Sequence, residues 1–105
     1  MSRVRTERPV DYAAEDALLL SGERIATWRR ILGLTQTQVA ERAGVSRGAL
    51  VRVEAGEPGP TIDTFFRVLG ALHITEQVTD ALDPMNTAVG MARAEEILPK
   101  RVRRA

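Results

Sequence analysis

Apolar residues recur at helical spacing through the middle of this chain, between residues 21 and 82. Most of these stretches follow a residue that favours a helix N-cap and end at a glycine or a proline, the ordinary signals for the two ends of a helix. The pattern predicts five helices, over residues 22–32, 36–43, 47–55, 62–72 and 76–82. No stretch alternates apolar and polar residues as a half-buried strand does, so the sequence predicts an all-α fold.

The same spacing predicts the caps and the core. The caps are expected at Thr35, Ser46, Thr61 and Thr75. The residues expected to face inward are Ile25, Trp28, Ile31, Leu32, Val39, Ala43, Leu50, Val53, Phe66, Leu69 and Leu72. His73 follows the fourth helix, where a left-handed residue is expected. Histidine tolerates that conformation, so a capping role is favoured over a ligand role.

Two further segments flank this predicted 21–82 domain. Residues 1–20 are expected to form a basic arm, broken by Pro9, and a short helix over 12–20 that Asp11 caps. Ser21 and Gly22 either interrupt this helix or cap the next, and the pattern leaves both open. Residues 83–105 are expected to form a C-terminal extension, with a helix over 88–98 that Thr87 caps and a basic tail from Lys100.

The stretch from Leu32 to Gly56 has the steric features of a helix-turn-helix. Two helices that cross steeply need a small residue at the crossing, and Ala40 lies there. The turn needs a residue that accepts positive φ, which Gly44 supplies without a Cβ clash. Val45 is the apolar residue expected to be buried after the turn, and Leu50 anchors the second helix. This spacing predicts a helix presented to the DNA major groove.

If Leu50 and Val53 face inward, four residues of that helix face outward: Arg47, Gly48, Val51 and Arg52. An arginine in the first turn can donate two hydrogen bonds to guanine, Gly48 permits a close approach, and valine can contact a thymine methyl group. Arg52 reaches either a base or a phosphate. Read alone, the two arginines are better explained as ordinary solvated charges. The turn spacing is what reverses this in favour of DNA contact.

Four further positions support this surface. Gln36 and Ser46 each begin a helix and are expected to contact phosphates, and Gln36 is also expected to brace Arg47. Arg29 and Glu54 are expected to form a salt bridge that fixes the scaffold, the alternative being two unpaired surface charges.

Composition narrows the classes of function. The chain has 105 residues, a net charge of +1, no cysteine and one histidine, so neither a disulfide nor a zinc site is expected. The longest fully apolar run, Ala17–Leu20, is far too short to span a bilayer. No nucleophile, base and orienting group recur at useful spacing, so no enzyme and no cofactor are expected. The sequence predicts a cytoplasmic protein.

The matching residues WRRILGLTQTQVAERAGVSRGALVRVEAGE and TIDTFFRVLGALHI resemble the Cro/C1-type helix-turn-helix family, also called the XRE family, over residues 24–82. The resemblance implies a five-helix, lambda-repressor-like domain that binds double-stranded DNA as a homodimer on a palindromic operator. It places Arg47, Gly48, Val51 and Arg52 at base-reading positions, and Gln36 and Ser46 at phosphate or bracing positions. The protein would be a bacterial transcriptional repressor, associated with the nucleoid when bound to DNA.

A second resemblance concerns the segments TFFRVLGAL and DPMNTAVGMARAEEILPKRVRR, which are similar to HipB-like antitoxins. That resemblance implies a HipA-like kinase toxin as partner, with DNA binding used for autorepression. The basic tail would then contact the toxin, or equally a phosphate backbone. Two departures stand out: His73 replaces the family's glycine, and Gly48 and Val51 offer little for base reading.

Overall fold

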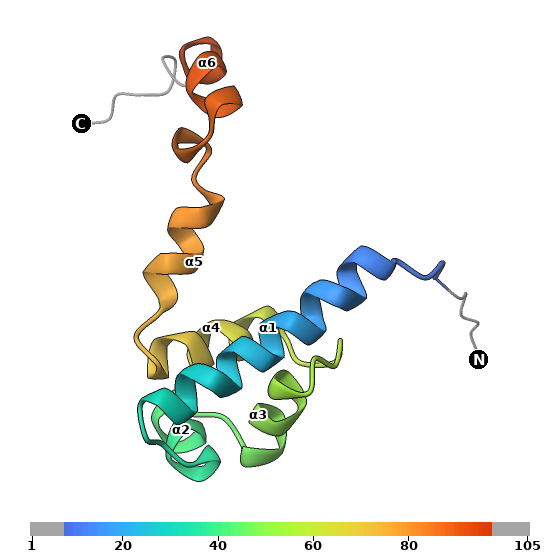
Figure 1. Cartoon of the computed structure of the whole chain (residues 1–105), viewed down its shortest axis with the longest axis vertical. Helices are drawn as coiled ribbons and strands as arrows, with labels where there is room; N and C mark the ends of the chain where they lie inside the picture. The colour runs from blue at the N-terminus through green and yellow to red at the C-terminus, as the bar shows by residue number, and fades with distance from the viewer. Residues whose placement is uncertain (1–7, 98–105) are drawn as a thin grey trace. The chain divides into compact units, whose positions relative to one another are not determined.

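The computed structural model describes residues 8–97 (Figure 1). The chain forms two compact units, Met1–Leu72 and His73–Ala105, and each is described by itself. The first unit contains α1 (Tyr12–Ile31), α2 (Gln36–Ala43), α3 (Arg47–Glu54) and α4 (Ile62–Ala71). The second contains α5 (Thr75–Leu82), the 3₁₀ helix η1 (Pro84–Asn86) and α6 (Ala88–Ile97). Residues 8–97 contain no strand, and the predicted all-α class with an additional C-terminal helix is confirmed. The N-terminal arginines Arg3 and Arg5 and the tail from Lys100 lie outside the described residues.

Helix α1 is continuous, so residues 12–20 are not the separate short helix that the sequence predicted. Asp11 caps it as expected, with its Oδ1 accepting a hydrogen bond from the backbone N–H of Ala14 (3.0 Å). Gly22 lies in the middle of α1 and is buried. A Cβ at this position would come within 2.5 Å of the carbonyl oxygen of Glu54 and 2.6 Å of that of Val53. Gly22 therefore permits a close approach between α1 and α3 and does not mark a helix end.

A second glycine supports the same approach from the other side. Gly56 follows α3 with φ 75°, and a Cβ there would come within 2.7 Å of the Cα atom of Leu19. Together with Gly22, it brings the backbones of α1 and the C-terminal end of α3 into contact. Substitution of either glycine must displace backbone, because the nearest atoms are not the ends of flexible side chains.

The core of the first unit is formed where α2, α3 and α4 meet, around the fully buried Val39, Leu50, Val68 and Leu69. Most residues expected to face inward are buried or half-buried. Ile31 is an exception, because 68% of it is exposed. Each three-residue step from Ile25 falls about 60° short of a full turn, so Ile31 lies about 120° round the helix from Ile25. Leu32, at the C-cap, is also exposed (43%).

Side-chain caps begin most of the helices as predicted. The hydroxyl groups of Thr35, Ser46, Thr61 and Thr87 accept hydrogen bonds from backbone N–H groups in the first turn of the helix that follows. Thr75 does not act as a cap, because α5 begins at Thr75 itself and is preceded by Ile74. A residue already in helical conformation lacks the extended backbone that a capping side chain requires. His73 is left-handed as expected, with φ 61°.

The second unit is joined by local polar contacts. The Asn86 side-chain amide donates to the carbonyl oxygen of Asp80 (2.6 Å), and Asp83 accepts from the backbone N–H of Met85 (2.9 Å). Gly90 of α6 lies so close to Pro84 that no Cβ would fit. Helices α5, η1 and α6 bury no residue within the described chain. Their large exposed apolar residues are Leu82, Met85, Val89, Met91 and Ile97.

Within residues 8–97, no helix combines the length and the apolar character needed to cross a membrane.

Candidate nucleic-acid interface

The crossing of α2 and α3 follows the predicted steric plan. Ala40 is only 3% exposed, and Gly44 ends α2 in the left-handed conformation with φ 71°. The backbone N–H of Val45 then donates to the carbonyl oxygen of Ala40 (3.0 Å), which closes the turn. Leu50 is fully buried and anchors α3. Val45 is half-buried, less than the sequence predicted, because it lies in the turn with one side toward solvent.

Helix α3 presents the expected outward face. Ser46 caps it by accepting from the backbone N–H of Ala49 (3.0 Å). The four residues expected to read bases are all exposed: Arg47, Gly48, Val51 and Arg52. Leu50 and Val53 are buried on the opposite side. The structure therefore brings a solvent-exposed first turn with an arginine to the surface of a rigid bundle.

Arg29 and Glu54 form a bidentate ion pair, the pair expected from the sequence. Arg29 Nε lies 2.7 Å from Glu54 Oε2, and Arg29 Nη2 donates to Glu54 Oε1 (3.1 Å). The two side chains are only 12% and 8% exposed, and Nη1 of Arg29 also donates to the carbonyl oxygen of Leu34 (3.1 Å). The hydrogen bond that Arg29 donates to Glu54, opposed by burial, raises the pKa of Arg29 above its ordinary value. Arg29 therefore remains charged throughout the pH range in which proteins fold.

Gln36 extends this ion pair toward the exposed arginine. Its Nε2 donates to Glu54 Oε1 (3.0 Å), and its Oε1 accepts from Arg47 Nη2 (3.1 Å). A carboxylate can only accept and a guanidinium can only donate, so the two partners together fix which way the amide points. We call the resulting chain of contacts the Arg29–Glu54–Gln36–Arg47 relay.

The bond between Gln36 and Glu54 was missed by the sequence analysis. The sequence feature that could have predicted this bond is the seven-residue spacing of Arg47 and Glu54. This spacing puts both residues on one face of α3, about two turns apart. A single side chain at the start of α2 can then meet both. The bracing role expected for Gln36 is present in the geometry, whereas its contact with a phosphate stays a prediction.

Arg67 is a second residue that the sequence analysis missed. It lies on α4 and forms an ion pair with Asp63, one turn earlier, with 2.8 Å between Arg67 Nε and Asp63 Oδ2. Its Nη1 would be 3.2 Å from a Cβ at Gly44, so the guanidinium lies beside the turn between α2 and α3. The i, i+4 spacing of Asp63 and Arg67 could have predicted the ion pair. The position of the Arg67 guanidinium beside the turn depends on the packing of α4 and could not be predicted in this way.

In residues 8–97, no group of three or more His, Cys, Asp or Glu side chains is placed to hold a metal ion. The polar groups at the start of α3 are instead suited to hydrogen-bonding an external partner. A capped helix that begins beside a tight turn and carries an exposed arginine is the arrangement of a helix-turn-helix motif.

Comparison with known proteins agrees with this class. Residues 25–78 match a family model described as helix-turn-helix, and the chain belongs to this family, the XRE type. An immunity repressor protein of Bacillus phage phi105 is 42% identical over 53 residues, which are 50% of this chain and 37% of the repressor. The cryptic phage CTXphi transcriptional repressor RstR of Vibrio cholerae is 34% identical over 53 residues, 50% of this chain and 47% of the repressor.

An uncharacterized helix-turn-helix-type transcriptional regulator of Sinorhizobium fredii is 37% identical over 60 residues, 57% of this chain and 78% of that regulator. The matched segment thus spans less than half the length of the two phage repressors. No solved structure matches the chain. The predicted XRE resemblance is confirmed, and none of the three relatives is described as an enzyme or an antitoxin.

Proposed function

We propose that this protein is a sequence-specific, DNA-binding transcriptional repressor that acts as a homodimer on a palindromic operator, its own promoter included. The observation that carries the proposal is the exposed start of α3, where Arg47 is held by Gln36 on a buried scaffold. The phage repressors to which the chain is similar support the same class of activity. The protein would work in the cytoplasm, bound to the nucleoid DNA, and needs no cofactor and no catalytic group.

Arg47 is the principal base-reading residue in this proposal. Gln36 occupies one of the two N–H groups of Arg47 Nη2. The other Nη2 N–H lies on the same edge as either the Nε–H or an Nη1–H, so one edge of the guanidinium keeps two donors. Such a pair of donors matches the O6 and N7 acceptors of guanine, a contact worth about 1–3 kcal/mol of discrimination. Because the relay holds the guanidinium before DNA arrives, less side-chain entropy is lost on binding.

Gly48 supports close approach by a partner. A Cβ at this position would make only ordinary contacts, 3.7 Å from Arg52 Nη1 and 3.9 Å from Ser46 Oγ. The fold therefore does not require glycine here. Glycine in a helix also costs about 1 kcal/mol of stability relative to alanine, so its presence needs another reason. A DNA edge that packs against the first turn of α3 accounts for the lack of a side chain at Gly48. Val51, on the same face, is placed to contact a thymine methyl group.

The remaining predicted residues contact the DNA backbone or, for Arg52, a base. Ser46 and Gln36 lie at the N-termini of α3 and α2, where backbone N–H groups and neutral side chains meet phosphates. Arg52 reaches a base or a phosphate from the next turn of α3. With a net charge of only +1, the chain has little general attraction for DNA, so affinity depends on these local contacts.

Repression follows from occupancy of a promoter by two copies. The recognition helices of a two-fold dimer meet half-sites about 34 Å apart, one turn of DNA. In this proposal residues 21–82 are the DNA-binding domain, residues 1–20 an arm and the start of α1, and residues 83–105 an extension.

The test is a gel shift on the DNA upstream of the protein's own gene. We expect Arg47→Ala with Arg52→Ala to abolish the specific complex. The matched control is Arg24→Ala, which removes an exposed arginine from α1 and should leave the complex intact. Unchanged binding by the double variant would rule out this mechanism.

The second unit favours one alternative, a HipB-like antitoxin that neutralises a HipA-like kinase toxin and represses its own operon. A 33-residue unit is too small to stabilise itself by its own core, and its helices bury nothing in the described chain. Its exposed apolar residues, such as Val89 and Met91, fit a surface that a partner covers. Full-length protein should then retain a kinase encoded beside its gene, whereas a chain that ends at Asp83 should not. Failure of both chains to retain it would leave a free-standing repressor.

A further inference from the structure

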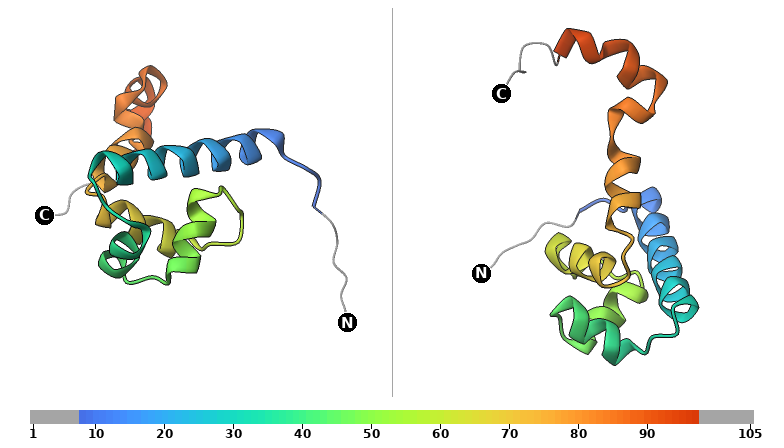
Figure 2. Two further views of the ribbon diagram at one scale, coloured as in Figure 1. Left: turned by 60° about the horizontal axis from the view of Figure 1, so that its bottom comes forward. Right: turned by 90° about the vertical axis from the view of Figure 1, so that its left-hand side faces the viewer.

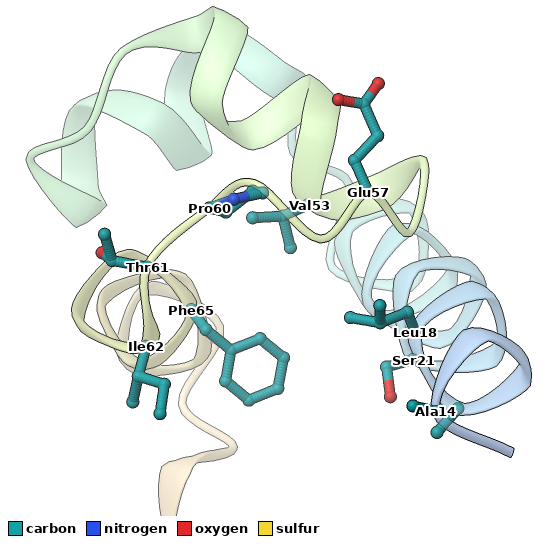
Figure 3. Close-up of a pocket in the computed structure, with 10 residues that line it drawn as sticks. Ala14, Leu18, Ser21, Val53, Glu57, Pro60, Thr61, Ile62 and Phe65 are labelled. Carbon is teal, nitrogen blue, oxygen red and sulfur yellow. The ribbon is translucent and has the colours of Figure 1, made fainter. Parts of the chain in front are cut away.

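An apolar groove lies on the first unit, between the first half of α1 and the start of α4. Its volume is about 360 Å³. Ala14, Leu18 and Ser21 of α1 form one wall, Val53 forms the floor, and Ile62 and Phe65 of α4 form the other wall (Figure 3). We call this the α1–α4 groove. Glu57 is the single charged residue in its lining.

The helix that forms one wall of the groove is itself exposed. All nine residues from Tyr12 to Leu20 are exposed, including Tyr12 (73%), Leu19 (53%) and Leu20 (44%). The first turns of α1 extend beyond the end of α3 (Figure 2, left). We call these nine residues the α1 ridge. A helix gains most of its stability from packing. The ridge touches the described chain closely at Gly56, beside Leu18 and Leu19, but its side chains stay exposed, which fits a contact with another molecule.

We propose that the α1–α4 groove and the α1 ridge are the homodimer surface, each copy placing its ridge against the groove of the other. This inference rests on the proposed dimeric repressor. A two-fold interface must be self-complementary, so the same patch must contain both the projection and the recess that receives it. The ridge and the groove meet this condition because α1 belongs to both.

The available area is sufficient for a stable dimer. A standard interface buries about 800 Å² on each partner, about a tenth of the 7666 Å² that the chain exposes. At the mean of about 73 Å² per residue, 7666 Å² over 105 residues, about eleven residues meet this requirement. The ridge offers seven residues besides the acidic Glu15 and Asp16, and the groove lining adds seven more.

The position of the patch also suits the proposed function. The groove lies at the C-terminal end of α3, beside Val53, whereas Arg47 lies at the N-terminal end. A second copy seated there leaves the base-reading turn free. Because Gly22 and Gly56 hold α1 against α3 with no room for a Cβ, a dimer joined through α1 would fix the separation of the two recognition helices.

The charges on the patch predict how this dimer responds to salt. On a helical projection, Glu15 and Asp16 lie about 100° and 200° from Ala14, away from the stripe that lines the groove. The contact is therefore mainly apolar, with Glu57 of each copy at the rim. Added salt should leave dimerisation unchanged or strengthen it, whereas it should weaken DNA binding.

The test measures the mass of the full chain in solution at tens of micromolar, together with its circular dichroism. Wild-type protein should be a dimer of the 11.5 kDa chain. Ala17→Glu places a carboxylate in the groove lining and should raise the dimer dissociation constant at least about tenfold while the helix content is retained. Ile31→Glu, at an exposed position of α1 outside the patch, should remain dimeric.

A cross-link provides a measurement that does not depend on a disruptive variant. The chain has no cysteine, so Ser21→Cys gives one thiol in the groove, and a short bifunctional maleimide should join two copies. Ile31→Cys should not cross-link. A dimeric Ala17→Glu variant, a monomeric wild type, or equal cross-linking at both positions would each overturn the inference.

Failure here is distinguishable from failure of the proposed function. If Ala17→Glu stays dimeric and wild-type protein still shifts operator DNA, the repressor stands and the groove is overturned. If Ala17→Glu becomes monomeric but wild-type protein binds no operator, the groove is the dimer surface and the repressor is overturned. If both hold, Ala17→Glu should bind a half-site as wild type does and lose only the cooperative affinity for the full operator.

Discussion

The two ends of α3 are held in different ways. At its C-terminal end, Glu54 pairs with the mostly buried Arg29, and the backbone of Glu54 lies so close to Gly22 that no Cβ fits there. At its N-terminal end, Arg47 and Gly48 are exposed, and a hydrogen bond to Gln36 restrains Arg47. One end is therefore fixed by the core and the other is free to meet a partner. A helix anchored at one end can present a side chain accurately without burying it.

The largest expected effect comes from the anchored end. Glu54→Ala leaves the mostly buried Arg29 without its carboxylate, which should cost about 3 kcal/mol of unfolding free energy. Urea denaturation followed by circular dichroism measures the loss. Asp63→Ala breaks an exposed ion pair with Arg67 and should cost less than about 1 kcal/mol. Equal costs for the two variants would show that the Arg29–Glu54 pair does not anchor α3.

The next effect comes from the contact of α1 with α3. Gly22→Ala forces the two backbones apart and should cost about 1–3 kcal/mol, despite the better helix propensity of alanine. Thermal unfolding gives the shift. Gly59→Ala is the control, because a Cβ there meets nothing within 4 Å. A Gly22→Ala protein as stable as wild type would contradict the close packing of α1 on α3.

The relay can be cut between the two ends. Gln36→Met keeps the size of the side chain but removes both hydrogen bonds, so Arg47 loses its brace while the Arg29–Glu54 pair remains. We expect about 1 kcal/mol less stability and a weaker preference for the base pair that Arg47 reads. Gln38→Met removes a capping bond to Thr35 at the same helix and should lose similar stability with the base preference intact. Equal base preferences in these two variants would make Gln36 merely structural.

The smallest effect on stability is expected at the free end. Gly48→Ala makes only ordinary contacts within the chain and should stabilise it by about 0.5–1 kcal/mol. The same methyl group should weaken operator binding, because it occupies the space that the DNA edge needs. The alanine that destabilises at Gly22 would thus stabilise at Gly48. Undiminished operator binding by Gly48→Ala would remove the argument for close approach.

Much of this arrangement could be predicted from sequence because it depends on local chemistry. The caps at Thr35, Ser46 and Thr61 and the left-handed Gly44 each involve residues three or four positions apart. The outward position of Arg47 follows from helical periodicity alone. The family comparison then confirmed the class of the fold that these local features predicted.

The features that the sequence did not predict depend on contacts between distant residues. In the sequence, Gly22 looks like a residue that interrupts a helix. Its actual role, to make room for the backbone of Glu54, is visible only when that residue, 32 positions later, is placed against it. The bond from Gln36 to Glu54 likewise needs the crossing of α2 and α3 in three dimensions. The α1–α4 groove exists only because α1 and α4, far apart in the sequence, both contact α3 and leave a recess between them. Ile31 differs, because its exposure follows from the helical angle and could have been found by measuring that angle.

The most direct test of the central claim is a scan of the operator, one base pair at a time, with wild-type protein and Arg47→Ala. The account predicts that wild type discriminates at every contacted pair, and that Arg47→Ala loses about 1–3 kcal/mol of discrimination at a single G·C pair in each half-site while keeping its preferences elsewhere. A uniform loss across all positions, or no loss at any, would show that the exposed start of α3 does not read the DNA sequence.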